Sequence, residues 1–390
     1  MDLITSLEKK FRQIYNEQPL MVRSPGRVNL IGEHTDYNMG FVLPAAIDKS
    51  IYFAVAPRSD ETCRIFSVDM NDEHTFLLSD LRRSLKGWPD YITGVVDQFL
   101  KARYRILGFN CIFGGNIPIG AGLSSSAAIE AGLAFALNHM FELGIDSLDL
   151  IRMAQKAENE FVGVQCGIMD QYINIFGREE HVLQLDCRSL QRKYFPVDHR
   201  LAIVLFDTGI SHSLAASEYN QRRNECNEGV KIIRKLYPGV THLRDVSTDV
   251  LEDSRPQLSP LLYRRCKFVV EENARVLDAC QSLEEKDIKT FGRCMAASHE
   301  GLSHEYEVSC PELDFLVQSV GDLPTVYGSR MMGGGFGGCT INLVEREAVT
   351  EVTGTVREKY HRKFASDAKA YVTSISGGTS IVMEKEPAKA

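Results

Sequence analysis

Short apolar runs and longer amphipathic segments alternate along the first half of the chain. The opening stretch, MDLITSLEKKFRQIY, has the apolar spacing of an amphipathic helix. Residues 124–141 begin with three serines, which cap helices well, and continue in Ala, Leu and Glu without proline, which predicts a second helix. Residues 147–161 predict a third. Strands are predicted in the remaining apolar runs, at residues 40–47, 50–58, 109–119, 181–187 and 200–209.

The second half is richer in helix. Apolar spacing predicts long helices at residues 217–237 and 260–285. A glycine-rich stretch is followed by a strand at 340–345, a helix at 348–364 and a strand at 368–375. The charged tail, residues 384–390, is predicted to be disordered. We place a domain boundary near residue 195, which gives an N-terminal domain of residues 1–195 and a C-terminal domain of residues 196–390.

Composition narrows the functional class. With 390 residues, 44% hydrophobic and 25% charged, the chain is long enough for two domains with cores of their own. The net charge of −8 argues against a nucleic-acid or acidic-membrane partner. No apolar run approaches the length of a membrane span, the N-terminus lacks the features of a signal peptide, and a cytoplasmic location is expected. The ten cysteines form no C-x-x-C pair and are expected to act mostly as small core residues.

The stretch RSPGRVNLIGEHTDYNMG, residues 23–40, interrupts an apolar segment with charged and turn-forming residues. A surface loop and a binding site would both account for this composition.

The segment IPIGAGLSSSAAIEAGL has the composition of a phosphate-binding loop. Glycines allow the backbone to approach a ligand closely, and the free N–H groups at a helix start attract anions. The segment lacks the Gly-Lys-Ser/Thr of a Walker A loop. Ser124 to Ser126 could also simply cap the helix, and the sequence leaves both interpretations open.

Two carboxylates stand out. Glu158 falls on the apolar side of the helix at 147–161, one turn after Ala154, where a carboxylate is costly unless it is paired or binds a metal. A structural salt bridge and a Mg²⁺ ligand are both consistent with that position. Asp170 follows a glycine turn and could cap the next helix or act as a base toward a substrate hydroxyl.

The stretch MMGGGFGGCTINLV contains G-x-G-x-x-G at Gly333, Gly335 and Gly338. A dinucleotide fingerprint needs a strand before and a helix after it, whereas a strand follows here. We therefore expect a loop that packs closely against another segment or a ligand.

Several segments together resemble one family, the GHMP small-molecule kinases, and within it the galactokinases. They are GRVNLIGEHTDYNMG, IPIGAGLSSSAA, AENEFVGVQCGIMDQ, DCRSL, SHSLAASEYNQRR, HEYEVSCPELD and GGGFGGC. The resemblance implies an α+β fold with an N-terminal ribosomal-S5-like domain, a C-terminal ferredoxin-like domain and the active site between them. It implies ATP-dependent phosphorylation of D-galactose at the C1 hydroxyl, with Mg²⁺ as cofactor and no obligate protein partner.

The resemblance also implies residue roles. Asp170 matches the catalytic base, and Arg27 the arginine beside it. The residues matching sugar contacts are Glu33, His34, Thr35, Asp36 and Tyr219. Those matching ATP contacts are Gly120, Ala121, Gly122, Leu123, Ser124, Ser125, Ser126 and, by position near adenine, Trp88. Ser126 and Glu158 match the Mg²⁺ ligands.

Two alternatives stay open at this point. A related kinase could act on N-acetylgalactosamine or another sugar, and a sensor could bind galactose and ATP without catalysis. The family's sensors have a shortened serine–alanine segment, whereas LSSSAA is complete here. Met332 departs from the threonine that the family commonly has before the triple glycine. The motifs leave Arg23 unexplained, and the simplest interpretation of it is a surface charge.

Overall fold

The computed structural model describes residues 3–118, 120–210 and 215–383. The charged tail at 384–390 lies outside the described residues, as does Ile119 at the end of one predicted strand. Apart from the predicted strands at 40–47 and 50–58, the remaining predicted helices and strands are present within a few residues of their expected bounds. Of the ten cysteines, seven are buried and all are unpaired thiols, as expected of core residues.

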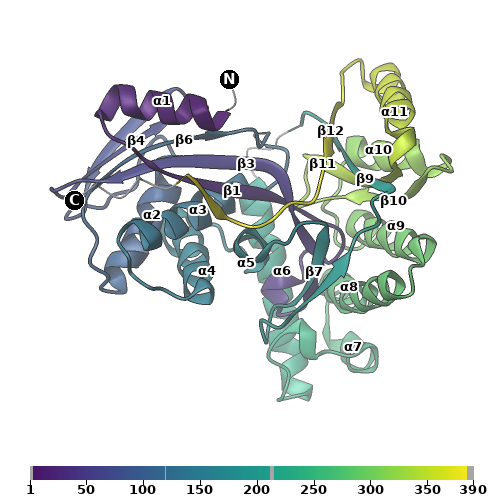
Figure 1. The fold of residues 1–390 in the computed structure, drawn as a ribbon. Coiled ribbons are helices and arrows are strands. Elements are labelled where there is room, and N and C mark those ends of the chain that lie inside the picture. The colour runs from purple at the N-terminus through teal and green to yellow at the C-terminus, as the bar shows by residue number, and fades with distance from the viewer. Residues whose placement is uncertain (1–2, 119, 211–214, 384–390) are drawn as a thin grey trace.

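The first half is built on a six-stranded sheet with strand order β13-β1-β3-β6-β4-β5. The strands are β1 (Leu20–Asn29), β3 (Pro44–Pro57), β4 (Thr62–Ser67), β5 (Asp72–Leu77), β6 (Phe109–Gly115) and β13 (Ser380–Met383). One face is covered by α2 (Pro89–Lys101), α3 (Ser125–Met140), α4 (Ser147–Lys156) and α5 (Met169–Phe176), and α1 (Leu3–Tyr15) covers the other (Figure 1). The sheet thus has a core on each face.

Two strand predictions need correction. Residues 40–47 and 50–58 do not form two strands: β3 runs through the polar pair Asp48–Lys49, and only a short β2 (Phe41–Val42) precedes it. Pairing with β1 on one side and β6 on the other holds β3 together along its length. Strand β1 itself was not predicted, because Pro25 and Gly26 look like breakers. A register shift between Pro25 and Arg27 accommodates them.

The second half is built on a four-stranded antiparallel sheet with strand order β10-β11-β9-β12. Its strands are β9 (Leu201–Asp207), β10 (Val326–Met331), β11 (Cys339–Glu345) and β12 (Lys369–Thr373). Helices α10 (Pro311–Gly321) and α11 (Val349–Phe364) pack on one face, and α8 (Pro260–Glu284) and α9 (Ile288–His304) lie on the other side. Helices α6 (Ala215–Leu236) and α7 (Thr248–Ser254) pack beside α8.

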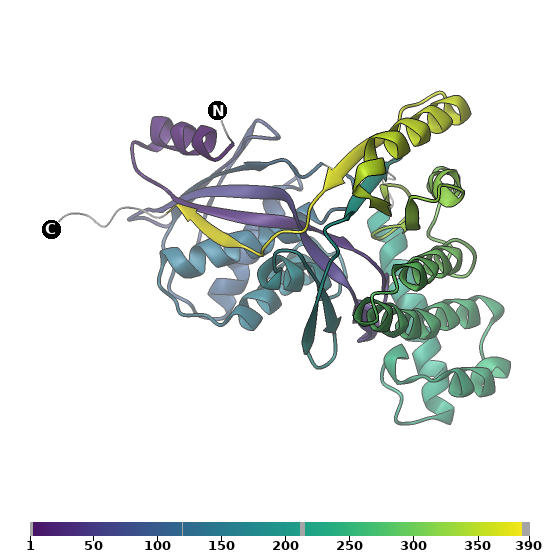
Figure 2. The same ribbon diagram turned by 45° about the vertical axis from the view of Figure 1, so that its right-hand side comes forward.

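The two halves are connected twice, because the C-terminal end of the chain comes back to the first sheet. A small sheet of β2, β7 (His181–Asp186) and β8 (Arg192–Pro196) precedes β9, and the chain later comes back so that β13 pairs with β1 (Figure 2). Arg23 secures this return, since it donates to Ile47 O and Gly377 O, both at 3.1 Å, and to the Ser376 hydroxyl. The interpretation of Arg23 as a surface charge is therefore wrong.

Candidate active site

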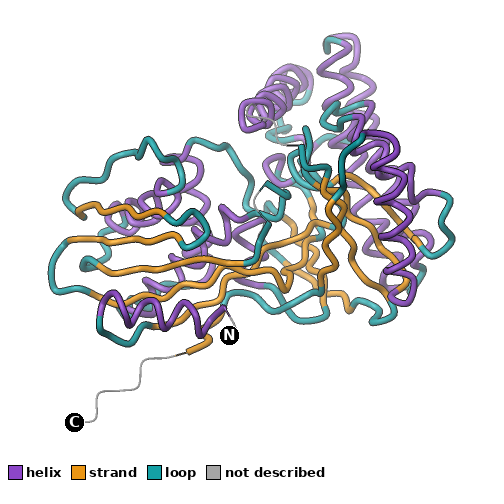
Figure 3. The backbone as a smooth tube through the Cα atoms, turned by 90° about the horizontal axis from the view of Figure 1, so that it is seen from above, coloured by secondary structure: helices purple, strands orange, loops and turns teal. Residues whose placement is uncertain are grey.

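A cavity of about 160 Å³ lies where segments from both halves meet. The long strands of the first sheet lead toward this junction (Figure 3). Its walls come from β1, the loop at residues 33–35, the start of the short helix Asp36–Asn38, the region 158–170, α6 and the glycine loop at residues 333–338. The lining residues are Arg27, Glu33, His34, Asp36, Glu158, Val164, Cys166, Gly167, Met169, Asp170, Tyr219, Gly333 and Gly334. Most of the residues predicted for catalysis, sugar binding and metal binding are thus brought to one cavity.

Asp170 lies at the centre of a charged group. Arg27 donates to both of its carboxylate oxygens, Nε to Oδ1 and Nη2 to Oδ2, each at 2.8 Å. The Ser124 hydroxyl also donates to Asp170 Oδ2. Burial lowers the pKa of Arg27, but the charges of Asp170 and Glu33 outweigh it, so the pKa lies above its ordinary value. Arg27 therefore stays charged beside the Asp170 carboxyl group.

This arrangement decides both capping interpretations. Ser124 occupies the N-cap position of α3 with φ of 56°, and its side chain makes no capping hydrogen bond. Asp170 lies in the first turn of α5, whose N-cap is Ile168. The Asp170 carboxylate accepts hydrogen bonds from Arg27 and Ser124. Neither side chain acts as a simple helix cap.

The glycine–serine loop is pinned against β1. Gly26 leaves no room for a side chain, since a Cβ there would lie 2.9 Å from Leu123 O. Arg27 N donates to Leu123 O at 3.2 Å, and Arg27 Nη1 to Gly122 O at 2.5 Å. The loop then enters α3 at Ser125, whose first-turn N–H groups have no intrahelical partner. This is the backbone arrangement of an anion site at a helix start.

Glu158 lies in a π-helical turn, Ala157–Val162, that continues α4 and was predicted as ordinary α-helix. It is buried, as predicted, and accepts from Gln171 Nε2 at 2.8 Å. No Lys, Arg or His among the described residues forms an ion pair with it. The structural salt bridge is therefore not found. Burial, and then the charge of Asp170, raise the pKa of Glu158, while hydrogen bonding from Ser126 acts in the opposite direction.

Glu130 on α3 is a second buried carboxylate beside Glu158. Gln171 Nε2 also reaches its Oε2, at 3.3 Å, while its Oε1 has no partner. Burial, and then the charge of Glu158, raise its pKa well above the ordinary value. Two buried carboxylates and a nearby serine hydroxyl, without a cation among the described residues, fit the oxygen ligands of a divalent ion. Glu130 is the only Asp, Glu, Lys or Arg in the sequence of α3, and that isolation was a signal that could have found it.

Glu33 is held from the second half of the chain. Arg330, which is fully buried on β10, donates to Glu33 Oε1 at 3.0 Å and to the carbonyls of Leu30 and Asn29. Gly333 N donates to the same carboxylate oxygen at 2.9 Å. Sequence reasoning missed Arg330; the signal was a lone arginine in a strand directly before the glycine loop. That loop packs closely, as expected: a Cβ on Gly335 would lie 2.2 Å from Val308 O.

The other sugar-contact candidates differ in placement. Burial, and then the charge of Asp170, raise the pKa of Asp36 to about 7. Burial, and then the charge of Arg222, lower the pKa of His34 to about 3, so the ring is neutral at physiological pH. The ring of Tyr219 lies 5.3 Å from that of His34. The Thr35 hydroxyl donates to the carbonyls of Gly32 and Phe41, and Thr35 does not line the cavity.

Three family models match the chain. Residues 9–57 match the galactokinase galactose-binding signature, residues 90–178 the GHMP kinase N-terminal domain, and residues 279–362 the GHMP kinase C-terminal domain. A galactokinase of Roseiflexus sp. is 45% identical over 379 residues, which cover 97% of each chain. A galactokinase of Pyrococcus furiosus is 39% identical over 93% of this chain and 99% of its own.

The chain belongs to the galactokinase family. The structure of Lactococcus lactis galactokinase complexed with galactose agrees with this, with a TM-score of 0.94 and 31% identity over 98% of this chain and 100% of that one. The mevalonate kinase of Methanococcus jannaschii, 18% identical over 92% of this chain and 99% of its own with a TM-score of 0.62, shares the fold. The expected GHMP kinase fold is confirmed.

The predicted ATP contacts, which are the loop Gly120–Ser126 and Trp88, do not line the small cavity, and neither does Met332. Trp88 precedes α2, donates to Asp72 at 3.0 Å and packs 5.7 Å from Phe113; its role near adenine stays a prediction. Met332, the departure from the galactokinase pattern, is buried in the core, and its N–H donates to Cys339 O. Its side chain therefore fills space behind the glycine loop.

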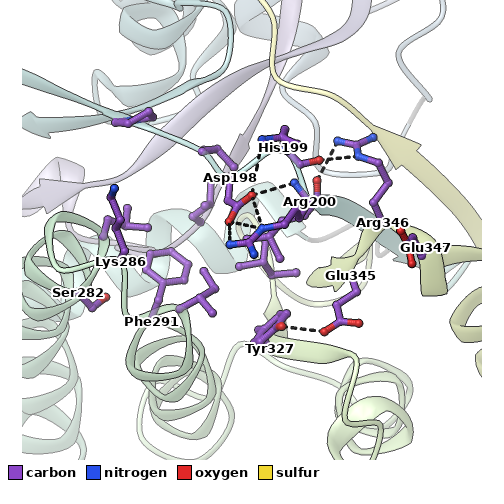
Figure 4. A pocket seen from close by; sticks show the side chains of 17 residues that line it. Asp198, His199, Arg200, Ser282, Lys286, Phe291, Tyr327, Glu345, Arg346 and Glu347 are labelled. Atoms are coloured by element: carbon purple, nitrogen blue, oxygen red, sulfur yellow. Dashed lines mark hydrogen bonds and ion pairs between the residues drawn. The ribbon is translucent and has the colours of Figure 1, made fainter.

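A larger cavity, of about 1000 Å³, lies between residues 196–201, the α8–α9 junction and strands β10 and β11 (Figure 4). Several of its charged side chains are paired with neighbours in the wall: Arg200 with Asp198, and Glu345 with the Tyr327 hydroxyl. Leu30 is the one residue of the galactokinase-like segments that lines it, and none of the residues predicted for catalysis or for sugar, ATP or metal binding does so. We therefore assign the active site to the smaller cavity. Among the described helices, none has the length and apolar character needed to cross a bilayer.

Proposed function

We propose that this member of the galactokinase family transfers the γ-phosphoryl group of ATP to the C1 hydroxyl of D-galactose, giving galactose 1-phosphate and ADP. The observation that carries the proposal is Asp170, which faces a polar cavity, pairs with Arg27 through both oxygens and touches Ser124 of the glycine–serine loop. One carboxylate thus lies between a sugar-sized cavity and a phosphate loop. The galactose named in the Lactococcus lactis structure supports this substrate.

Asp170 accepts the proton of the C1 hydroxyl, which raises the nucleophilicity of that oxygen toward the γ-phosphorus. Arg27 holds the carboxylate in place with two parallel hydrogen bonds. Its positive charge also opposes the negative charge that develops on the transferred group. The pair therefore combines a base with electrostatic stabilisation.

The loop Gly120–Ser126 binds the ATP phosphates through its backbone N–H groups and the positive end of α3. Ser126 and Glu158 would hold Mg²⁺ beside the phosphates, with Glu130 next to Glu158. Bound there, the ion would supply charge neutralisation to the ATP phosphates. The sugar hydroxyls bind to Glu33, His34, Asp36 and Tyr219. Thr35 stabilises the loop that includes Glu33 and His34.

Asp170→Ala tests the assignment. Phosphorylation of galactose should fall by several orders of magnitude, whereas galactose binding measured by calorimetry should change little. Asp149→Ala, a change to an exposed aspartate on α4, is the matched control and should keep wild-type turnover. Near-normal turnover in Asp170→Ala would show that Asp170 is not the base.

The substrate is tested separately. Turnover of galactose, N-acetylgalactosamine, arabinose and glucose by the wild-type protein should be highest for galactose. Absence of galactose turnover with activity on another of these sugars would refute the proposed substrate while leaving the kinase chemistry intact.

A further inference from the structure

A line of buried hydrogen bonds runs from His34 into the second half of the chain. His34 Nδ1 lies 2.8 Å from the Tyr37 hydroxyl, which lies 2.8 Å from the Tyr306 hydroxyl. The Tyr306 hydroxyl in turn lies 3.1 Å from Cys226 Sγ. All four side chains are buried. The line therefore joins the EHTDY segment to the HEYEVSC segment. The proposed reaction mechanism assigns no role to the HEYEVSC segment.

A neutral imidazole has one nitrogen that donates and one that accepts, so the partner of Nδ1 decides what Nε2 offers. Burial, followed by the charge of Arg222, lowers the pKa of His34 to about 3, and the ring is therefore neutral. Nε2 has no hydrogen-bond partner among the described residues, and His34 lines the sugar cavity. The ring nitrogen without a partner is thus the one left for a substrate.

The two possible tautomers are not equivalent. If the thiol donates to Tyr306, Tyr306 to Tyr37 and Tyr37 to His34 Nδ1, every hydrogen in the line has an acceptor. The reverse direction ends on the thiol sulfur, which is a weak acceptor, and makes Nε2 an acceptor. The direction of the line therefore favours a hydrogen on Nε2.

We propose that Tyr37, supported by Tyr306, is a positioning residue that holds neutral His34 as the Nε2–H tautomer, so that the ring offers a donor to an oxygen of the substrate. The consequence for the sugar rests on the proposed role of His34 in binding it. The tautomer itself follows from the hydrogen-bond line alone.

The two tyrosines can be tested without removing their rings. The Tyr306 ring packs 4.7 Å from Phe268, and its carbonyl accepts from Arg222 Nε at 2.8 Å. The Tyr37 ring lies 5.4 Å from Tyr219. Tyr37→Phe and Tyr306→Phe therefore delete one hydroxyl each and keep the packing.

Nitrogen NMR of protein labelled with ¹⁵N-histidine reads the tautomer directly, and the His34 signals are assigned by their loss in His34→Gln. The wild type should show a protonated Nε2 and an unprotonated Nδ1 at neutral pH. Tyr37→Phe should shift His34 toward a mixture of tautomers. Tyr306→Phe and Cys226→Ala should keep the wild-type tautomer, because Tyr37 still donates to Nδ1.

Kinetics provide the second readout. Tyr37→Phe should raise KM for galactose on the order of tenfold, with a smaller change in kcat. A tenfold change corresponds to the net free energy of about one hydrogen bond. Tyr306→Phe should raise KM less. A protonated Nδ1 in the wild type, or an unchanged tautomer in Tyr37→Phe, overturns the proposal. The expected NMR series with an unchanged KM would instead refute the sugar-binding role of His34.

Discussion

Position 167 offers a sharp test of the sugar site, because only glycine, which has no Cβ, fits there beside Asp36. A Cβ at position 167 would lie 1.9 Å from Asp36 Oδ2 and 2.1 Å from its Cγ. Non-bonded atoms essentially never approach a Cβ closer than 3.0 Å. In Gly167→Ala the carboxylate and the loop must therefore separate by roughly 1 Å or more. A misplacement of that size in a reacting site costs about 100-fold in rate.

We accordingly expect kcat/KM for galactose to fall about 100-fold in Gly167→Ala, equivalent to ~2.7 kcal/mol of lost transition-state stabilisation. The assay is steady-state ADP release at saturating ATP, with galactose varied. Gly239→Ala is the matched control, since nothing lies within 4 Å of a Cβ there and its φ is not strained. It should behave as wild type.

A double-mutant cycle shows whether the effect passes through Asp36. If Gly167→Ala acts by displacing that carboxylate, the double variant with Asp36→Ala should be no worse than Asp36→Ala alone. Additive losses would mean that the methyl group disturbs something else. A folded Gly167→Ala variant with kcat/KM within about twofold of wild type would refute the steric reasoning.

Three further outcomes are expected. Burial raises the pKa of Asp36 to about 7, so protonation between pH 8 and pH 6 should raise KM for galactose about tenfold, and Asp36→Asn should flatten that profile. Glu158→Gln should raise the Mg²⁺ concentration needed for half-maximal rate at least about tenfold in a metal titration, whereas Glu160→Gln, at an exposed position in the same turn, should not. Arg330→Met should lower the free energy of unfolding by about 3–5 kcal/mol in denaturant melts, because it leaves Glu33 buried without its cation; unchanged stability would contradict that account.

The sequence by itself determined the local features of this protein. The serine-led helix, the two long helices of the second half and the strands β7, β9, β11 and β12 follow from apolar spacing and residue preference. The inward position of Glu158 followed from the face of its helix. These features depend on near neighbours in the chain, which a sequence records directly. The resemblance to the family, by contrast, indicated which distant residues would gather in one cavity.

The tertiary structure alone decided how distant residues act together. Pairing on both sides, not local preference, keeps β3 continuous and lets β1 pass through Pro25 and Gly26. Arg330 meets Glu33 across 297 residues of sequence, and Tyr306 meets Tyr37 across 269. Such contacts arise because the second sheet is folded against the end of β1, so their partners leave no periodic signal in either segment. That most of the candidate residues meet at one cavity was therefore predictable, while the buried partners that orient them were not.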